Sequence, residues 1–158
     1  MAKTKEIVLI LHNVRSAHNV GAIFRTAEAA GVNQIYLTGY TPAPLDRFDR
    51  PNKELAKTAL GAEKILEWQS VEKINNLFNK LLASGFQLIA LEQSKNSIKY
   101  KKVKLAGPTA IIVGNEVTGL SPAILKRCDV IAEIPMYGRK ESLNVAVATG
   151  IFLFSPLK

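Results

Sequence analysis

The sequence predicts an α/β fold built on a mostly parallel sheet, and three observations support this. Short apolar runs of strand length alternate along the chain with stretches whose apolar residues recur at helical spacing. Several of these runs are continuously apolar, which is typical of strands covered on both faces. The length of 158 residues suits one domain, and 47% hydrophobic with 22% charged residues is a globular composition. We therefore expect a parallel sheet flanked by helices.

Six short runs have the length and composition of strands. The runs at 6–11, 86–91 and 109–113 are the most continuously apolar and are expected to be buried strands. The expected strands, in chain order, are 6–11, 34–38, 64–68, 86–91, 109–113 and 130–134.

The expected helices follow these strands. In the first, at 19–30, apolar residues recur every three or four positions, Asn19 can cap the start and Gly31 can end it. The stretch 70–83 is amphipathic, with its apolar residues on one face. Residues 39–52 contain three prolines and are expected to form a surface loop. Further helices are expected at 53–60, 122–126 and 142–154.

Composition and charge narrow the classes of function. The chain has 21 Lys+Arg against 13 Asp+Glu, and this net charge of +8 favours a polyanionic partner, although a basic protein without one fits equally well. One cysteine excludes a disulfide framework and a cysteine-rich zinc site, and fits a reducing compartment. The apolar run at 7–11 is too short for a signal peptide or a membrane span. We expect a cytoplasmic protein with no membrane association.

Unusual polar residues follow three of the expected strands, at the edge where parallel sheets bind ligands. After strand 6–11, Arg25 lies one turn into an otherwise apolar helix, so its guanidinium needs a carboxylate, a protein interface or a phosphate. Asn19 and Gly21, taken alone, indicate only a helix start with a close turn. After strand 109–113, Gly114 and Gly119 flank Glu116. This second cluster lacks the sequence of a P-loop or a Rossmann site and, taken alone, fits a turn with one exposed acid.

The third cluster follows strand 130–134. Ser142 is a good N-cap for the last helix, which places Asn144 inside that helix. Asparagine is unfavourable in a helix interior unless its amide forms a specific hydrogen bond. Either a functional contact or a buried hydrogen bond to the neighbouring loop would explain it.

In this order, the three clusters resemble the three motifs of the SpoU-type (TrmH-like) branch of the SPOUT methyltransferases. The matching segments are Asn19-x-Gly21-Ala-Ile-x-Arg25-Thr-Ala, then Gly114-Asn-Glu116-x-x-Gly119-Leu-Ser, then Ile134-Pro-Met136 followed by Ser142-Leu-Asn144-Val-Ala-Val-Ala. The resemblance covers residues 7–154, and a chance match to all three motifs is very improbable.

The resemblance implies methyl transfer from S-adenosylmethionine to a ribose 2′-hydroxyl of tRNA or rRNA, by a homodimer whose C-terminal part forms a deep trefoil knot. It implies that Gly114, Ile134, Met136 and Leu143 hold the cofactor, largely through backbone groups. An adenine ring would find apolar walls there, and Gly114 would leave room for close approach of the ligand. The end of strand 86–91 is a weaker candidate for the same pocket.

The resemblance also implies catalytic roles for Arg25, Asn19, Glu116, Ser142 and Asn144. It assigns removal of the hydroxyl proton to Arg25, although a guanidinium is effectively always protonated. Arg25 would either fix the target phosphate or ribose while the phosphate assists deprotonation, or act as a base in a strongly perturbed site. Asn19 and Asn144 would orient substrate or loops, Ser142 would cap the last helix and touch substrate, and Glu116 would anchor Arg25 or Asn19. In the dimer, Arg25 is expected to serve a site completed by the partner subunit.

RNA contact is expected from loops rather than from a separate domain, because one methyltransferase domain would fill residues 1–158. The segment 95–104 has five lysines and no acid, with Tyr100 among them, which suits phosphate binding with stacking or simply a solvated loop. The candidate contacts are Lys99, Lys101, Lys102, Arg139 and Lys140, with Arg47 and Arg50 as further candidates. His12, His18 and Cys128 lack metal-ligand spacing, so no metal is expected.

Two other functions fit the same fold. One is a basic RNA-binding or assembly protein without turnover, against which the intact motifs argue. The other is a base-methylating relative, which the pattern of Arg25 and Asn144 disfavours. The last helix is expected to stop at Pro156, earlier than in many members of the family, which leaves the extent of the dimer interface open.

Overall fold

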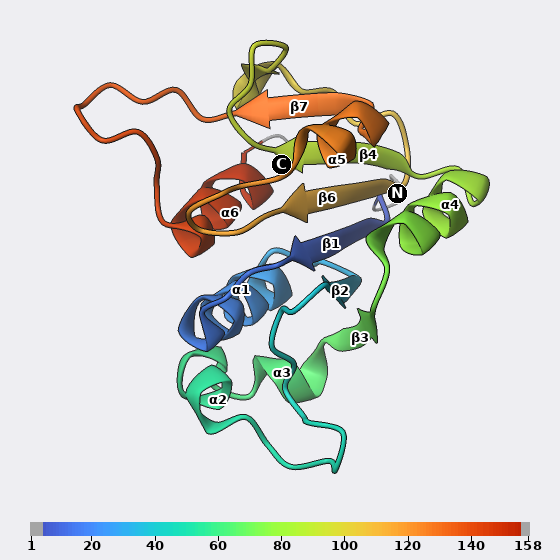
Figure 1. Ribbon diagram of the computed structural model, residues 1–158, viewed down its shortest axis with the longest axis vertical. Helices are drawn as coiled ribbons and strands as arrows, with labels where there is room; N and C mark the ends of the chain where they lie inside the picture. The colour runs from blue at the N-terminus through green and yellow to red at the C-terminus, as the bar shows by residue number, and fades with distance from the viewer. Residues whose placement is uncertain (1–4, 156–158) are drawn as a thin grey trace.

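The computed structural model describes residues 5–155, so Pro156 lies outside them. Seven strands form one sheet in the order β3-β2-β1-β6-β4-β7-β5, and every neighbouring pair is parallel (Figure 1). The predicted parallel α/β architecture is confirmed. The strands are β1 (Ile7–His12), β2 (Gln34–Thr38), β3 (Glu67–Val71), β4 (Gln87–Leu91), β5 (Ile98–Lys99), β6 (Thr109–Val113) and β7 (Val130–Glu133).

The two edge strands are where the strand predictions fail. The strand expected at 64–68 is wrong, because a short helix occupies Ala62–Ile65 and the strand begins only at Glu67. β3 lies at an edge of the sheet and is mostly exposed, so it lacks the apolar pattern of a buried strand. β5, at the other edge, has two exposed residues inside the lysine-rich segment and carries no strand pattern.

The helices are α1 (Ala17–Ala29), α2 (Lys53–Ala59), α3 (Ala62–Ile65), α4 (Ile74–Ala83), α5 (Pro122–Arg127) and α6 (Val145–Leu153), with a 3₁₀ turn at Tyr100–Lys102. Two predicted caps are wrong. Ser16, not Asn19, caps α1 by accepting a hydrogen bond from the backbone N–H of Asn19. Asn144, not Ser142, caps α6 by accepting from two backbone N–H groups of its first turn. Asn144 therefore does not lie in a helix interior.

The sheet separates two hydrophobic cores, because successive side chains of a strand point to opposite faces. In β1, Leu9 and Leu11 belong to one core, which includes Phe24 of α1 and Phe152 of α6. Val8 and Ile10 belong to the other, which includes Phe78 of α4. The helices α1, α2, α3 and α6 thus cover one face, while α4 and α5 cover the other.

Gly21 permits the close contact between α1 and α2. A Cβ atom at this position would overlap the carbonyl oxygen of Leu55 and the side chain of Thr58. The residue therefore serves helix packing rather than the close turn expected from the sequence. Gly150 of α6 is different, because a Cβ there would meet only the methyl group of Thr26, at 3.4 Å.

We expect Gly21→Ala to lower the free energy of unfolding by about 1–2 kcal/mol, because the added methyl group forces α1 and α2 apart. The matched variant Gly150→Ala should be neutral or stabilising by up to ~1 kcal/mol, because alanine favours the helix and space is available. Urea denaturation of both variants measures the difference. Equal effects of the two substitutions would contradict this account of Gly21.

Candidate functional site

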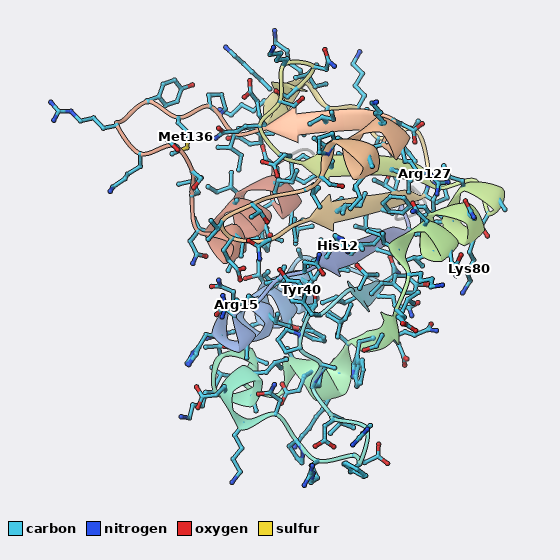
Figure 2. All side chains as sticks on the ribbon, in the orientation of Figure 1. His12, Arg15, Tyr40, Lys80, Arg127 and Met136 are labelled. Carbon is cyan, nitrogen blue, oxygen red and sulfur yellow. The ribbon has the colours of Figure 1, made fainter. Side chains whose placement is uncertain are left out.

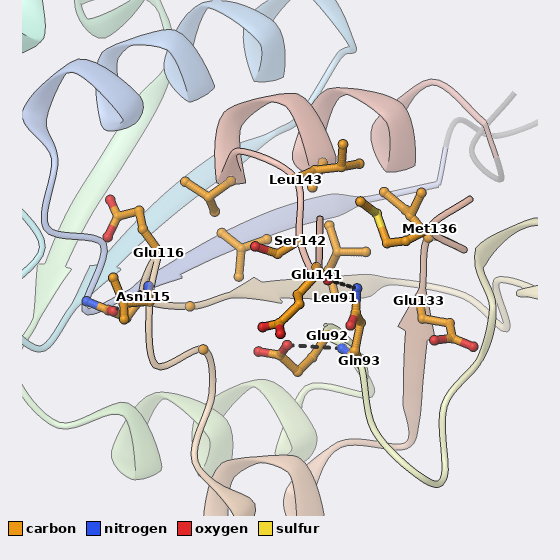
Figure 3. Close-up of a pocket in the computed structure, with 17 residues that line it drawn as sticks. Leu91, Glu92, Gln93, Asn115, Glu116, Glu133, Met136, Glu141, Ser142 and Leu143 are labelled. Atoms are coloured by element: carbon orange, nitrogen blue, oxygen red, sulfur yellow. Dashed lines mark hydrogen bonds between the residues drawn. The ribbon is translucent and has the colours of Figure 1, made fainter. Parts of the chain in front are cut away.

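A cavity of about 260 Å³ opens at the carboxyl edge of the sheet (Figure 3). Its walls come from the end of β4, the loops after β6 and β7, and the start of α6. The loop between β7 and α6 extends away from the body of the molecule before it returns to this edge (Figure 1). The apolar side chains in the wall are Leu91, Val113, Val117, Ile134, Met136, Leu143, Val145 and Ala148, and the polar ones are Glu92, Gln93, Asn115, Glu116, Glu133, Glu141 and Ser142.

The four residues expected to hold a cofactor, Gly114, Ile134, Met136 and Leu143, all line this cavity. Leu91, at the end of the strand named as a weaker candidate, lines it as well. The structure thus brings together segments that are more than 50 residues apart in the chain.

Gly114 is required by the packing of its own loop. A Cβ at this position would lie 2.8 Å from the Leu120 side chain and 2.9 Å from the carbonyl carbon of Gly119. Gly119 has a positive φ of 64°, and a Cβ there would overlap the carboxylate of Glu92. The two glycines allow the loop after β6 to fold tightly against the end of β4.

Glu92 and Gln93 form hydrogen bonds to the loops of the cavity, and neither belongs to the three sequence motifs. Glu92 Oε2 accepts a hydrogen bond from the backbone N–H of Leu120 at 2.9 Å. Gln93 Nε2 donates to the backbone carbonyl of Glu141 at 2.9 Å, and so ties the loop after β7 to the end of β4 (Figure 3). Their position directly after an expected buried strand is the feature that could have identified them.

A chain of hydrogen bonds joins the three motifs beside this cavity. Glu116 Oε1 accepts from Asn19 Nδ2 at 3.3 Å and from the backbone N–H of Ser16 at 3.0 Å. Its other oxygen, Oε2, accepts from the backbone N–H of Arg15 at 3.1 Å. Asn144 Nδ2 donates to Asn19 Oδ1 at 3.1 Å, while its own Oδ1 caps α6. Of the two anchoring roles expected for Glu116, the structure shows the contact with Asn19.

The hydrogen bonds to Glu116 favour its charged form. Desolvation by burial raises the pKa of this carboxyl, but the backbone N–H groups of Ser16, Arg15 and Glu116 itself, together with the Asn19 amide, outweigh it. The net pKa lies below the ordinary value of 4.5, so Glu116 is ionised at neutral pH.

Arg25 lies outside this network. Its side chain is exposed on α1, and within residues 5–155 it has no hydrogen-bond or ion-pair partner. It does not line the cavity, whereas Ser142 lines it and is exposed. A single chain therefore joins Asn19, Glu116 and Asn144 by hydrogen bonds. It places Glu116 and Ser142 in the cavity wall and leaves Arg25 outside both groups.

The expected RNA contacts are exposed at the same edge. Lys99 of β5 lies opposite Glu133 of β7 in the strand register, and Glu133 lines the cavity. Lys101 and Lys102 follow in the 3₁₀ turn. Arg139 and Lys140 are exposed in the loop between β7 and α6. The further candidates Arg47 and Arg50 place their guanidinium carbons 4.8 and 5.0 Å from the ring centre of exposed Phe48. Arg50 Nε is also paired with Asp46 Oδ2 at 2.8 Å, whereas the other candidates are exposed without an ion-pair partner within residues 5–155.

The histidines and the cysteine are held in local contacts. The ring of His12 contacts Thr38 Oγ1 at 2.9 Å, and desolvation by burial lowers its pKa. Burial raises the pKa of the Cys128 thiol to about 12. His18 contacts the Glu54 carboxylate on the surface. Residues 5–155 contain no group of three or more acids, histidines or cysteines placed to hold a metal ion, and none of their helices is long and apolar enough to cross a membrane.

We expect Glu116→Gln to lower the free energy of unfolding by about 1 kcal/mol at pH 7, because an amide cannot accept at both positions. Since the folded-state pKa is depressed, this stabilisation is complete above the unfolded-state pKa and is lost as pH falls through the folded-state value. The difference between wild type and variant should therefore narrow below the ordinary pKa of 4.5. Urea denaturation across pH measures it, with Glu28→Gln on the exposed part of α1 as control; a gap independent of pH would contradict the assignment.

Comparison with known proteins shows relatives over almost the whole chain. The model of the SpoU rRNA Methylase family matches residues 6–154. The tRNA (guanosine(18)-2′-O)-methyltransferase of Aquifex aeolicus is 38% identical over 155 residues, 96% of this chain and 69% of that protein. The 23S rRNA (guanosine-2′-O-)-methyltransferase RlmB of Pseudomonas aeruginosa is 33% identical over 96% of this chain.

Among solved structures, the AdoMet-bound rRNA methyltransferase from Sinorhizobium meliloti superposes with a TM-score of 0.83, at 30% identity and over 99% of this chain. The chain spans 58% of the Pseudomonas protein and 57% of the Sinorhizobium one. The family match, the fold and the three linked motifs agree, and the chain belongs to the SpoU rRNA methylase family.

Proposed function

We propose that the protein transfers a methyl group from S-adenosylmethionine to a ribose 2′-hydroxyl of tRNA or rRNA. The observation that carries the proposal is the hydrogen-bond chain from Glu116 through Asn19 to Asn144, which joins all three motifs beside one cavity. The names of the Aquifex and Pseudomonas relatives support this reaction class. Since RNA is the proposed substrate, the proposed location is the cytoplasm.

The cavity fits S-adenosylmethionine in its chemistry. Ile134, Met136 and Leu143 provide apolar walls for an adenine ring. The carboxylates of Glu133 and Glu141 favour a positively charged ligand. The AdoMet-bound Sinorhizobium relative supports this choice of cofactor. When bound, the cofactor supplies a methyl group made electrophilic by the positive sulfonium.

Glu116 acts in this proposal as a fixed anchor and not as the base. Both of its oxygens already accept N–H groups, and its pKa is lowered, so it has little tendency to take a proton from a ribose hydroxyl. It holds Asn19 and the start of α1 in place. Ser142, exposed in the cavity wall, is left free to contact the substrate.

Arg25 is the proposed catalytic residue that binds the RNA. Its exposed guanidinium has no partner within residues 5–155, and two N–H donors of a guanidinium match the geometry of a phosphate. In this role it fixes the target phosphate or ribose, and the phosphate assists removal of the proton. This role requires no neutral arginine.

A homodimer would bring Arg25 to the cavity of the partner subunit. Val147 and Ile151 of α6, with its C-cap residue Phe154, form an apolar stripe at helical spacing, in which Val147 is 52% and Phe154 48% exposed. The same helix packs against α1, which carries Arg25. Burying this stripe against a second copy would stabilise the dimer.

Family membership further supports a deep trefoil knot in the C-terminal part, and an unthreaded path in a crystal structure would contradict it.

We expect Arg25→Ala to lower kcat for RNA methylation by about 100-fold or more, because the acceptor is no longer held in line with the methyl group. Binding of S-adenosylmethionine should be unchanged, since Arg25 does not line the cavity of its own chain and, in the proposed dimer, holds the RNA rather than the cofactor. Labelled cofactor with total tRNA and rRNA, followed by nucleoside analysis, measures both the rate and the site of methylation. Base-methylated products, no methylation by wild type, or full activity of the variant would each contradict the proposal.

Mixed dimers test whether Arg25 acts across subunits. Met136→Arg should abolish cofactor binding by adding a cation to the cavity wall. If the two inactive variants exchange subunits, half of the dimers are mixed and each has one intact site, so about a quarter of the wild-type activity should return. No recovery would show that Arg25 serves the cavity of its own chain.

Removing the exposed lysines should weaken RNA binding. We expect the triple variant Lys99→Ala, Lys101→Ala, Lys102→Ala to bind tRNA more weakly and to lower the slope of log K against log salt by about 2, since each phosphate contact contributes roughly 0.7–0.9. Lys80→Ala is the control, because this exposed lysine lies on α4, away from Met136 and the cavity loops (Figure 2). If the affinity lost per lysine removed were the same in the triple variant as in Lys80→Ala, the specific contact of the three lysines with RNA would be contradicted.

A further inference from the structure

A second hollow lies beside the cavity, and the two share a wall. The shared wall is the turn at 115–117, whose residues line both spaces. The hollow has a volume of about 750 Å³. Besides the shared turn, its lining residues are Arg15, Ser16, Tyr40 and Thr118. The motifs do not include Arg15 or Tyr40, and the proposed mechanism gives neither a role.

Tyr40 is held in place although its side chain is 61% exposed. Its hydroxyl accepts a hydrogen bond from Asn115 Nδ2 at 3.0 Å, and the same amide donates to the backbone carbonyl of Asn13 at 3.0 Å. The backbone N–H of Tyr40 donates to Asn13 Oδ1 at 3.1 Å. Contacts at both ends thus fix the residue and leave most of it open to the hollow. An aromatic ring fixed in advance loses little entropy when a planar ligand stacks on it.

Arg15 supplies a positive charge to the same hollow. Its backbone N–H is bound by Glu116, which places the residue, while its exposed side chain has no partner within residues 5–155. Figure 2 shows Arg15 and Tyr40 close together, and both line the hollow. An aromatic platform beside an unpaired guanidinium is the combination that binds a base together with its phosphate.

We propose that this hollow binds a nucleotide of the RNA substrate, with its base stacked on Tyr40 and its phosphate at Arg15. The inference rests on the proposed function and deepens it, because it adds a binding site for the acceptor RNA. This site lies beside the methyl-donor cavity, and the turn that contains Glu116 lines both. Tyr40 is then a substrate-binding residue, and it acts on the acceptor without touching the donor.

Substitutions at Tyr40 separate stacking from packing. We expect Tyr40→Ala and Tyr40→Leu to lower kcat/KM for RNA by about 10-fold or more, mainly through KM, because neither side chain stacks on a base. Tyr40→Phe keeps the ring and loses only the contact with Asn115, so it should stay within about 3-fold of wild type. The dissociation constant for S-adenosylmethionine should be unchanged in all three. Ile65→Ala, at a position 72% exposed on α3, is the control for loss of surface apolar area.

Ring signals of Tyr40 in NMR spectra, assigned with Tyr40→Phe, give a readout that does not need turnover. Saturable shifts on titration with guanosine 5′-monophosphate or with unmodified tRNA would support the nucleotide site. Failure of both probes to shift these signals, or full kcat/KM in Tyr40→Ala while wild type methylates RNA, would overturn the inference and leave the proposed function standing. A wild-type protein that shifts these signals but methylates no RNA would instead refute the proposed function.

Discussion

The hydrogen bonds that Glu116 accepts are the interaction on which the site depends. One carboxylate, placed on the turn after β6, binds the backbone before α1 and the side chain of Asn19 within it. Asn19 in turn binds Asn144, which lies in the third motif and caps α6. These polar contacts fix three segments that are distant in sequence relative to one another. Hydrogen bonds are directional, so they define the relative position of the segments more sharply than hydrophobic packing does.

These hydrogen bonds can form because the sheet brings the segments that carry Asn19, Glu116 and Asn144 to one edge. All neighbouring strands are parallel, so the loops that follow β1, β4, β6 and β7 emerge on the same side. Tight loop packing at Gly114 and Gly119, and the bond from Gln93 to the backbone of Glu141, then shape the cavity between those loops. The rigid part of the site is therefore carried by the strands and by Glu116. The long loop between β7 and α6 supplies the apolar wall of Met136.

The buried strands and the site segments could be predicted from the sequence because burial leaves a continuous apolar pattern, as in β1 and β6. The edge strands could not, since β3 and β5 are held by backbone hydrogen bonds and expose most of their side chains. The sequence does not decide the helix caps, because Ser16, Asn19, Ser142 and Asn144 are all good N-caps and only the fold determines where each helix begins. Glu92 and Gln93 have only their position after an expected buried strand to mark them, and the contacts that give them and Tyr40 their roles are made with segments far along the chain.

Asn144 has two simultaneous tasks, and this limits which side chains the position accepts. Its carbonyl oxygen satisfies N–H groups at the start of α6, while its amide group donates to Asn19. Aspartate would cap the helix as well, but it has no hydrogen to donate and would add a second carboxylate to the chain that already contains Glu116. Helix capping and site assembly are therefore inseparable at this residue: a substitution chosen to preserve the stability of α6 would still remove its hydrogen bond to Asn19 of α1.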